Sequence, residues 1–363
     1  MKRTRPFLSI ATGCSAMLIL VLNSKTALLG TQKGIELCIY TVIPSLFPFF
    51  VISILLTGAL SGSSLAMLRP ILRFCKMPEG SGNLLTVGLL GGYPVGAKCI
   101  YDAWRRGQMS KADAQRCLGF CSNAGPAFIF GMCSALFSKI WIVWILWVIH
   151  IFSALLVGNL LPVDTESPRC SIRSNWMSLP QAMTNALTAI TSVCGWIVLF
   201  RVIIAFAQRW FLWLFPKNCA VAFEGILELA NGCAALASVE SEGMRFIFCA
   251  AFLGMGGLCV GLQTVSVVGE LGTGMYFPGK VVQCLISSCL ATLFASVNYH
   301  LCSPVIPFVA TILLIALILT KKKTVAFARR LVYNVEKDCK GGFLCYSERK
   351  LQNPAAIAPG EPK

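Results

Sequence analysis

Residues 91–98, GGYPVGAK, combine three glycines and a proline with a lysine inside an apolar stretch. A lysine at membrane depth requires a counter-charge or a polar cavity. Asp102 follows Lys98 by about one helical turn, so the two side chains can pair. We interpret the segment as a broken helix whose free backbone groups and Lys98 face a cavity for a solute. The alternative is a re-entrant loop that ends at the lipid headgroups, where Lys98 extends its amine to the interface.

Residues 122–126, SNAGP, form a second polar segment within apolar sequence. The Asn123 side chain both donates and accepts hydrogen bonds, and Pro126 leaves an upstream carbonyl group without its helical donor. These groups suit contact with a solute, or a clamp between two helices. Without an internal repeat in the chain, the clamp would be favoured.

Residues 224–232, EGILELANG, carry two carboxylates between apolar flanks. Glu224 and Glu228 lie four residues apart and Asn231 follows three residues later, so a continuous helix places all three on one face. Carboxylates at membrane depth are candidates for binding a coupling ion or a solute hydroxyl group. The alternative is an amphipathic helix that lies at the interface with its acidic face in water.

The glycines of the first segment recur in the second half of the chain at a constant offset of 165 residues. The matched pairs are Gly91 and Gly256, Gly92 and Gly257, Gly96 and Gly261, and Gly107 and Gly272, and the same offset pairs Lys98 with Gln263. Broken helices in two halves of a chain are typical of transporter binding sites. A glycine-broken element (119–137) and a plain span (141–161) lie between the units, so the second unit would enter the membrane in the opposite orientation. We therefore expect an inverted repeat; the alternative is coincidence among glycine-rich membrane helices.

Other chemistry is poorly supported by the sequence. Residues 274–281 approach a phosphate-binding loop, but valine replaces the hydroxyl residue that binds magnesium and no strand precedes it. For His150, inside an apolar span, a helix–helix contact is favoured over a proton relay. Most of the 18 cysteines lie in apolar runs and none form a CxxC pair, so a zinc site is not expected. No Ser/His/Asp or Cys/His arrangement stands out, and we expect neither an enzyme nor a bound cofactor.

Composition places these segments in a membrane. The 363 residues are 56% hydrophobic and only 13% charged, about half of the roughly 25% charged residues of a soluble domain. The mean hydropathy is +0.73. These values exclude an ordinary soluble enzyme and a disordered chain. The net charge of +16 comes largely from basic residues beside apolar segments, as positive-inside topology and anionic lipid require, so we expect no nucleic-acid partner.

We therefore expect an all-α polytopic membrane protein with about 7–9 transmembrane or re-entrant helices. Plain spans are predicted at 7–22, 141–161, 184–208, 281–298 and 305–320, with a proline-interrupted segment at 37–60. The expected parts are an N-terminal anchor helix (1–36), a first repeat (37–138), a connecting transmembrane helix and loop (139–179), a second repeat (180–300), a last transmembrane helix (301–323) and a basic, partly disordered tail (324–363). With the amino terminus inside, this count leaves the lysines at 321–323 outside, unless 220–239 also crosses or a re-entrant segment is miscounted.

These motifs resemble the YlbJ family of sporulation integral membrane proteins, within the nucleoside-recognition (Gate) domain proteins. The resemblance rests on residues 44–50, 92–98, 107–114 and 122–126, and in the second half on 228–232 and 256–263. It implies a bacterial cytoplasmic membrane protein, a fold similar to concentrative nucleoside transporters, and an association with endospore formation. The family usually has Ser and His where this chain has Cys259 and Gly261.

We predict a secondary carrier or channel for a small polar solute. Nucleosides are one candidate class, and the coupling ion, Na⁺ or H⁺, is left open. The expected partners are the lipid bilayer and the small polar solute, and a homo-oligomer is left open. The alternative function is a non-transporting assembly or scaffold factor for spore-envelope formation. The predicted solute-binding or pore-lining residues are Gly92, Tyr93, Pro94, Gly96, Lys98, Asp102, Asn123, Gly125, Pro126, Glu224, Glu228, Asn231, Gly257, Gly261 and Gln263.

Overall fold

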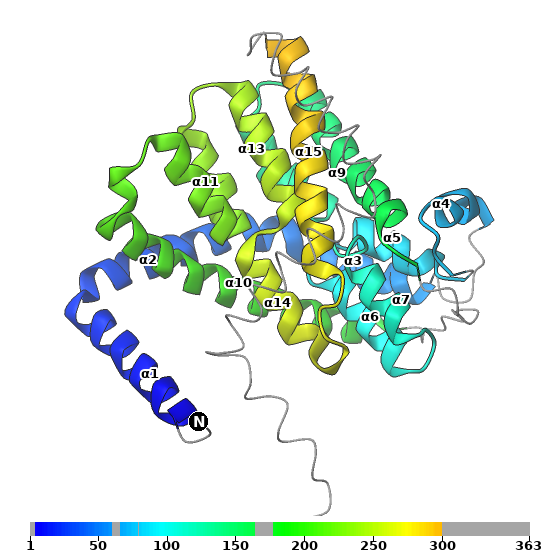
Figure 1. Ribbon diagram of the computed structural model, residues 1–363, viewed down its shortest axis with the longest axis horizontal. Helices are drawn as coiled ribbons and strands as arrows, with labels where there is room; N and C mark the ends of the chain where they lie inside the picture. Colours follow the sequence, from blue (N-terminus) through cyan, green and yellow to red (C-terminus); the bar gives the residue numbers. More distant parts are fainter. Residues whose placement is uncertain (1–3, 60–65, 79, 164–176, 300–363) are drawn as a thin grey trace, which may run out of the picture. The chain divides into compact units, whose positions relative to one another are not determined.

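The computed structural model describes residues 4–59, 66–78, 80–163 and 177–299, and every regular element in these ranges is a helix (Figure 1). The predicted all-α class is confirmed. The chain divides into two compact units, one of which contains α1 (Thr4–Leu22), while the other begins at Lys25. The predicted last transmembrane helix (301–323) and the basic tail (324–363) lie outside the described residues.

Five helical segments in the described ranges are long and apolar enough to cross a membrane, which confirms the predicted polytopic class. They are Ser24–Leu56, Ile140–Leu160, Leu179–Trp210, Glu242–Leu271 and Tyr276–Tyr299. The second, α9 (Ile140–Leu160), has 21 residues and is therefore about 30 Å long, the thickness of the hydrocarbon core of a bilayer. The third and fifth, α10 (Leu179–Trp210) and α15 (Tyr276–Tyr299), coincide with the spans predicted at 184–208 and 281–298.

Helix α9 shows how these spans are oriented. Trp144, Val148 and Phe152, spaced by four residues along one face, are about half exposed. Leu146 and Val157 lie on the opposite face and are completely buried. A ridge of large apolar side chains on the outside is the pattern of a helix whose outer face contacts lipid rather than water.

The proline-rich first span is continuous. It comprises α2 (Ser24–Leu37), a π-helical turn η1 (Cys38–Val42) and α3 (Ile43–Ala59), with Pro48 inside α3. In a regular α-helix the ring of Pro44 would clash with the carbonyl group of Tyr40, four residues earlier. Tyr40 lies within the π turn, which widens the helix at that point. The predicted interruption therefore takes the form of a local π turn, and the boundary that we expected at residue 37 falls inside one helical segment.

The remaining helices are shorter, and most of them flank a break in the backbone. They are η2 (Ala66–Leu68), α4 (Arg69–Phe74), α5 (Gly82–Leu90), α6 (Val95–Arg105), α7 (Lys111–Leu118), α8 (Pro126–Met132), η3 (Ser134–Leu136), η4 (Leu212–Leu214), α11 (Lys217–Leu227), α12 (Leu229–Ala235), η5 (Leu236–Ser238), α13 (Glu242–Met255), α14 (Gly257–Val268) and η6 (Gly269–Leu271).

Helices α9, α13 and α15 lie side by side and pack against one another (Figure 1). The approach of α13 to α15 depends on a small residue, because a Cβ atom on Gly254 would lie 2.7 Å from the Ser287 hydroxyl oxygen. That hydroxyl also bonds the Ser153 hydroxyl of α9 at 3.1 Å. Small and hydroxyl-bearing residues at such contacts are typical of helix packing in membranes.

Candidate functional site

Two broken helices meet at the centre of the larger unit. The first break separates α5 from α6 at residues 91–94, where the Tyr93–Pro94 peptide is cis, and the second separates α13 from α14 at Gly256. Both breaks fall where the glycine and proline pattern predicted them. They are in contact, because a Cβ atom on Gly256 would lie 3.0 Å from the Tyr93 hydroxyl oxygen.

Each break also packs against a second segment of irregular backbone. Gly92 has a φ of +75° and lies against Gly125, where an added Cβ atom would be 3.0 Å from the Gly92 Cα. Gly257 has a φ of +77°, and a Cβ atom there would lie 3.4 Å from the Leu229 backbone nitrogen, beside the break between α11 and α12. Side chains other than hydrogen are strained at such φ values and would be tightly packed here. Four irregular segments therefore converge, each from a part of the chain that is apolar in sequence.

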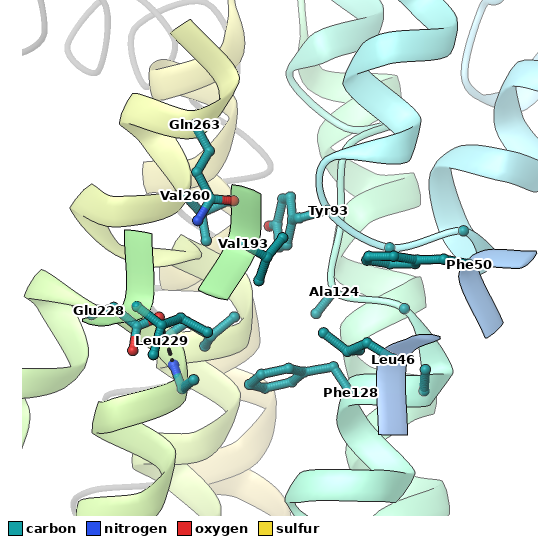
Figure 2. A pocket seen from close by; sticks show the side chains of 16 residues that line it. Leu46, Phe50, Tyr93, Ala124, Phe128, Val193, Glu228, Leu229, Val260 and Gln263 are labelled. Carbon is teal, nitrogen blue, oxygen red and sulfur yellow. Dashed lines mark hydrogen bonds between the residues drawn. The ribbon is translucent and has the colours of Figure 1, made fainter. Parts of the chain in front are cut away.

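A pocket lies among these four segments. Its lining is made of Leu46, Phe50, Gly91, Gly92, Tyr93, Ala124, Gly125, Ala127, Phe128, Val193, Ile197, Glu228, Leu229, Ala230, Val260 and Gln263. Figure 2 shows Glu228, Val260 and Gln263 on one side, with Tyr93 and Phe50 across from them. The cavity is small, with a volume of about 40 Å³.

Glu228 is the carboxylate of this pocket, and it caps a helix. Its backbone is extended (φ −147°, ψ 126°), and its side chain accepts hydrogen bonds from the N–H groups of Ala230 and Asn231 at the start of α12. The Asn231 side-chain amide donates to the same carboxylate at 2.7 Å. The side chain is buried, since the residue is 2% exposed. No basic side chain of the described residues forms an ion pair with it.

The helix break at Glu228 changes the predicted arrangement of the two glutamates. We expected Glu224, Glu228 and Asn231 on one helical face, but α11 ends at Leu227 and α12 starts at Leu229. Glu224 is buried elsewhere, where Arg201 Nη1 lies 3.7 Å from its carboxylate and the Gln208 amide donates to it. The expectation of one continuous face was wrong because the Glu228 carboxylate stabilises a new helix start. Glu224 instead joins α11 to α10.

Asn123 connects the other side of the site to a buried lysine. Its amide nitrogen donates to the carbonyl oxygens of Phe120 and Gly88, and its Oδ1 accepts from Lys280 Nζ at 3.0 Å. Lys280 Nζ also donates to Gln283 Oε1 at 2.9 Å. Asn123 therefore acts as a clamp between elements, the role that the isolated motif favoured, and it holds a cation as well.

Lys280 is the residue that the sequence interpretation missed. It is 2% exposed, and its ammonium lies 5.3 Å from the centre of the Tyr93 ring and 5.9 Å from that of Tyr276. No carboxylate in the described ranges is close enough to pair with it. Cation–π contacts and neutral amide oxygens thus replace a counter-ion. The available signal in the sequence was Gln283, which follows Lys280 by about one helical turn in an apolar span.

Lys98 lies away from the pocket. It pairs with Asp102 at 2.8 Å as the spacing predicted, but its side chain is 56% exposed. An exposed i,i+4 pair of this kind contributes only a few tenths of a kcal/mol. The position agrees with the alternative interpretation, in which Lys98 extends from α6 toward the interface.

The predicted site residues therefore divide into three groups. Those that line the pocket are Gly92, Tyr93, Gly125, Glu228 and Gln263. Those that flank or support it are Pro94, Asn123, Pro126, Asn231 and Gly257. The remaining residues do not line the pocket. Gly96 packs against Cys121 and Gly261 against Phe277. Glu224 lies near Arg201, and Lys98 pairs with Asp102.

Comparison with known proteins gives one informative similarity. The chain is 31% identical over 133 residues to the sporulation integral membrane protein YlbJ of Bacillus subtilis (strain 168). The match covers 36% of this chain and 32% of that protein, so it spans about a third of each. No family model matches the chain, and no solved structure matches it. The chain is thus an integral membrane protein related to a sporulation membrane protein, and its predicted resemblance to the YlbJ family is confirmed at this partial coverage.

Proposed function

We propose that this protein is a secondary carrier or channel of the bacterial cytoplasmic membrane that binds a small polar solute in the pocket at Glu228. The observation that carries the proposal is a buried carboxylate, without a basic partner in the described residues, at the point where two broken helices meet. Ionisable groups at membrane depth are costly and are retained for function. Irregular backbone at that depth is stable only inside protein or beside a polar cavity.

The pocket wall suits a solute with hydroxyl, amide or ammonium groups. Glu228 offers carboxylate oxygens, and Gln263 offers an amide whose nitrogen is directed to Cys259 Sγ at 3.4 Å. The Tyr93 hydroxyl is buried and has no hydrogen-bond partner among the described residues. A solute that bonded this hydroxyl would remove the cost of an unsatisfied polar group. Nucleosides, whose sugars carry hydroxyl groups, are one class with this chemistry.

An inverted repeat, and with it a fold similar to concentrative nucleoside transporters, belongs to the same proposal. Two of the glycine pairs matched at an offset of 165 residues have similar positive φ angles: +75° and +77° at Gly92 and Gly257, and +70° and +74° at Gly107 and Gly272. In both units a helix–break–helix element surrounds the first pair. This correspondence supports two related halves that could alternate around one site.

The small free volume gives weight to a second candidate function, a non-transporting scaffold in spore-envelope formation. A cavity of about 40 Å³ is far smaller than the roughly 300–1,000 Å³ of pockets that hold small molecules, so a carrier must widen it by moving α8, α12 or the breaks. A scaffold needs no such opening. The name of the similar B. subtilis protein refers to sporulation and not to transport.

A flux assay separates the two functions. The purified chain is reconstituted into proteoliposomes and offered labelled nucleosides, amino acids, sugars and polyamines, with an inward H⁺ or Na⁺ gradient. We expect accumulation of one class over protein-free liposomes and at least a tenfold loss in Glu228→Gln. The matched control is Glu240→Gln, because Glu240 is an exposed acid outside the pocket, and it should retain full uptake. Absence of flux for every class supports the scaffold, while unchanged uptake in Glu228→Gln refutes the site.

A further inference from the structure

Three cysteine thiols converge in the core, and none of them lines the pocket. The Sγ atoms of Cys133, Cys233 and Cys249 all lie within 4.8 Å of one another. All three residues are completely buried. The three cysteines are up to 116 residues apart in the chain, so their spacing in the sequence does not predict the cluster. In the described part of the chain, no other group of three or more His, Cys, Asp or Glu side chains converges in this way.

The three thiols belong to three different elements. Cys133 directly follows α8 as its C-cap residue, Cys233 lies in α12, and Cys249 lies in the middle of α13. Helices α8 and α12 begin at the pocket, where residues of their first turns form part of the lining. The cysteine cluster therefore joins these two short helices to the long helix α13, near the ends that point away from the pocket.

The surroundings of the cluster are apolar. The same hydrophobic core contains Ile129, Leu236 and Phe246, each completely buried. An ion that binds here loses its hydration and gains only sulfur ligands, so a complex with little net charge is favoured. Soft thiol ligands select soft metal ions such as Cu(I).

We propose that Cys133, Cys233 and Cys249 form a three-sulfur site for one monovalent soft metal ion of the Cu(I) class, which ties α8 and α12 to α13. Binding replaces one thiol proton: the metal ion bonds one thiolate, one H⁺ leaves, and the two neutral thiols complete the site as weaker sulfur donors, so the complex is uncharged. With metal–sulfur bonds of about 2.3 Å, three sulfurs in a plane around the ion are about 4 Å apart. That separation is within the 4.8 Å span observed. Zn²⁺ fits less well, because structural zinc sites take four ligands and the cluster supplies three.

The test uses the full chain purified in detergent under anaerobic, reducing conditions. Accessible thiols are first alkylated with N-ethylmaleimide, which spares buried ones. Copper is then supplied as its Cu(I) complex with a bathocuproine chelator, and the metal retained after desalting is counted by mass spectrometry. We expect one copper per chain, with three sulfur neighbours by X-ray absorption.

Variants locate the site. Cys133→Ala, Cys233→Ala and Cys249→Ala should each weaken copper binding at least tenfold. Cys117→Ala removes an equally buried thiol outside the cluster and should bind one copper as before. Gel filtration shows which variants fold. The X-ray absorption of the wild-type chain tests the site even if none of the three cluster variants folds.

Several results would overturn the proposal. These are no copper bound by the folded chain, fewer than three sulfur neighbours, or undiminished binding in a folded cluster variant. A disulfide among the three cysteines in the chain as isolated would also overturn it, and would assign the cluster to thiol oxidation instead. The outcome is independent of the flux assay, because neither measurement uses the other's residues.

Discussion

Glu228 combines two roles, the cap of α12 and the acidic group of the pocket, and replacing it by alanine measures the first. The variant Glu228→Ala leaves the buried N–H groups of Ala230 and Asn231 without the acceptors that they have at 2.9 and 2.6 Å. Each buried N–H left unsatisfied costs about 1–3 kcal/mol. The free energy of unfolding should therefore fall by about 2–6 kcal/mol.

Glutamine at position 228 should have a smaller effect. Its single amide oxygen can replace Oε2, which accepts from both nitrogens of Asn231, but its amide NH₂ then faces the Ala230 N–H, a second donor. One hydrogen bond is lost, at a cost of about 1–3 kcal/mol. The predicted order of stability is therefore wild type, then Glu228→Gln, then Glu228→Ala.

Thermal unfolding in detergent, followed by a dye that fluoresces on reaction with newly exposed thiols, measures this order. A change of 1 kcal/mol corresponds to about 2 °C for a chain of this size, so Glu228→Ala should unfold about 4–12 °C below wild type. Glu240→Ala, at an exposed position, should stay within about 0.5 kcal/mol of wild type. If Glu228→Ala unfolds at the wild-type temperature, the carboxylate does not cap α12 and the assignment is refuted.

Three further predictions test the fold around the site. Gly257→Ala should lower the free energy of unfolding by about 1–2 kcal/mol or more, because φ is +77° at that position. The control Gly195→Ala, in α10 with open space around the residue, should be neutral or raise the free energy of unfolding by up to about 1 kcal/mol. Equal unfolding temperatures for the two variants would contradict this prediction. Arg116→Gln should lower the free energy of unfolding by at least about 2 kcal/mol in the same assay, because the buried guanidinium donates to carbonyl oxygens at the C-terminal ends of α4 and α9. Wild-type stability in this variant would show that these hydrogen bonds contribute nothing. Val148→Arg, on the lipid-facing side of α9, should disfavour membrane insertion of the helix by about 2.5–3.5 kcal/mol, while Trp141→Arg, near the end of the helix, should insert well. A glycosylation-reporter assay measures insertion of both variants. Equal insertion of the two would refute the assignment of this face to lipid.

The backbone breaks were predictable from sequence because their causes are local. A glycine at positive φ or a proline without an N–H group acts on the turn in which it stands, whatever the rest of the fold does. The breaks at 91–94 and 256 and the start of α8 at Pro126 therefore fall where the residues indicated. The membrane class follows from composition in the same way, since 13% charged residues cannot cover a protein surface in water.

The direction in which each polar side chain points was decided by tertiary structure. Lys98 and Lys280 both stand in apolar sequence, yet one is exposed beside Asp102 and the other is buried against Asn123 and Tyr93. Which face of a helix is covered depends on elements far away in the chain, and no local pattern carries that information.

Glu228 and the cysteine cluster show the same division. By itself the sequence determined an all-helical membrane protein whose helices break at particular glycines and prolines. Only the tertiary structure decided that Glu228 starts a helix instead of sharing a face with Glu224, and that Cys133, Cys233 and Cys249 meet. The physical reason is that backbone breaks arise within a single turn, whereas these contacts are made by segments that only packing brings together.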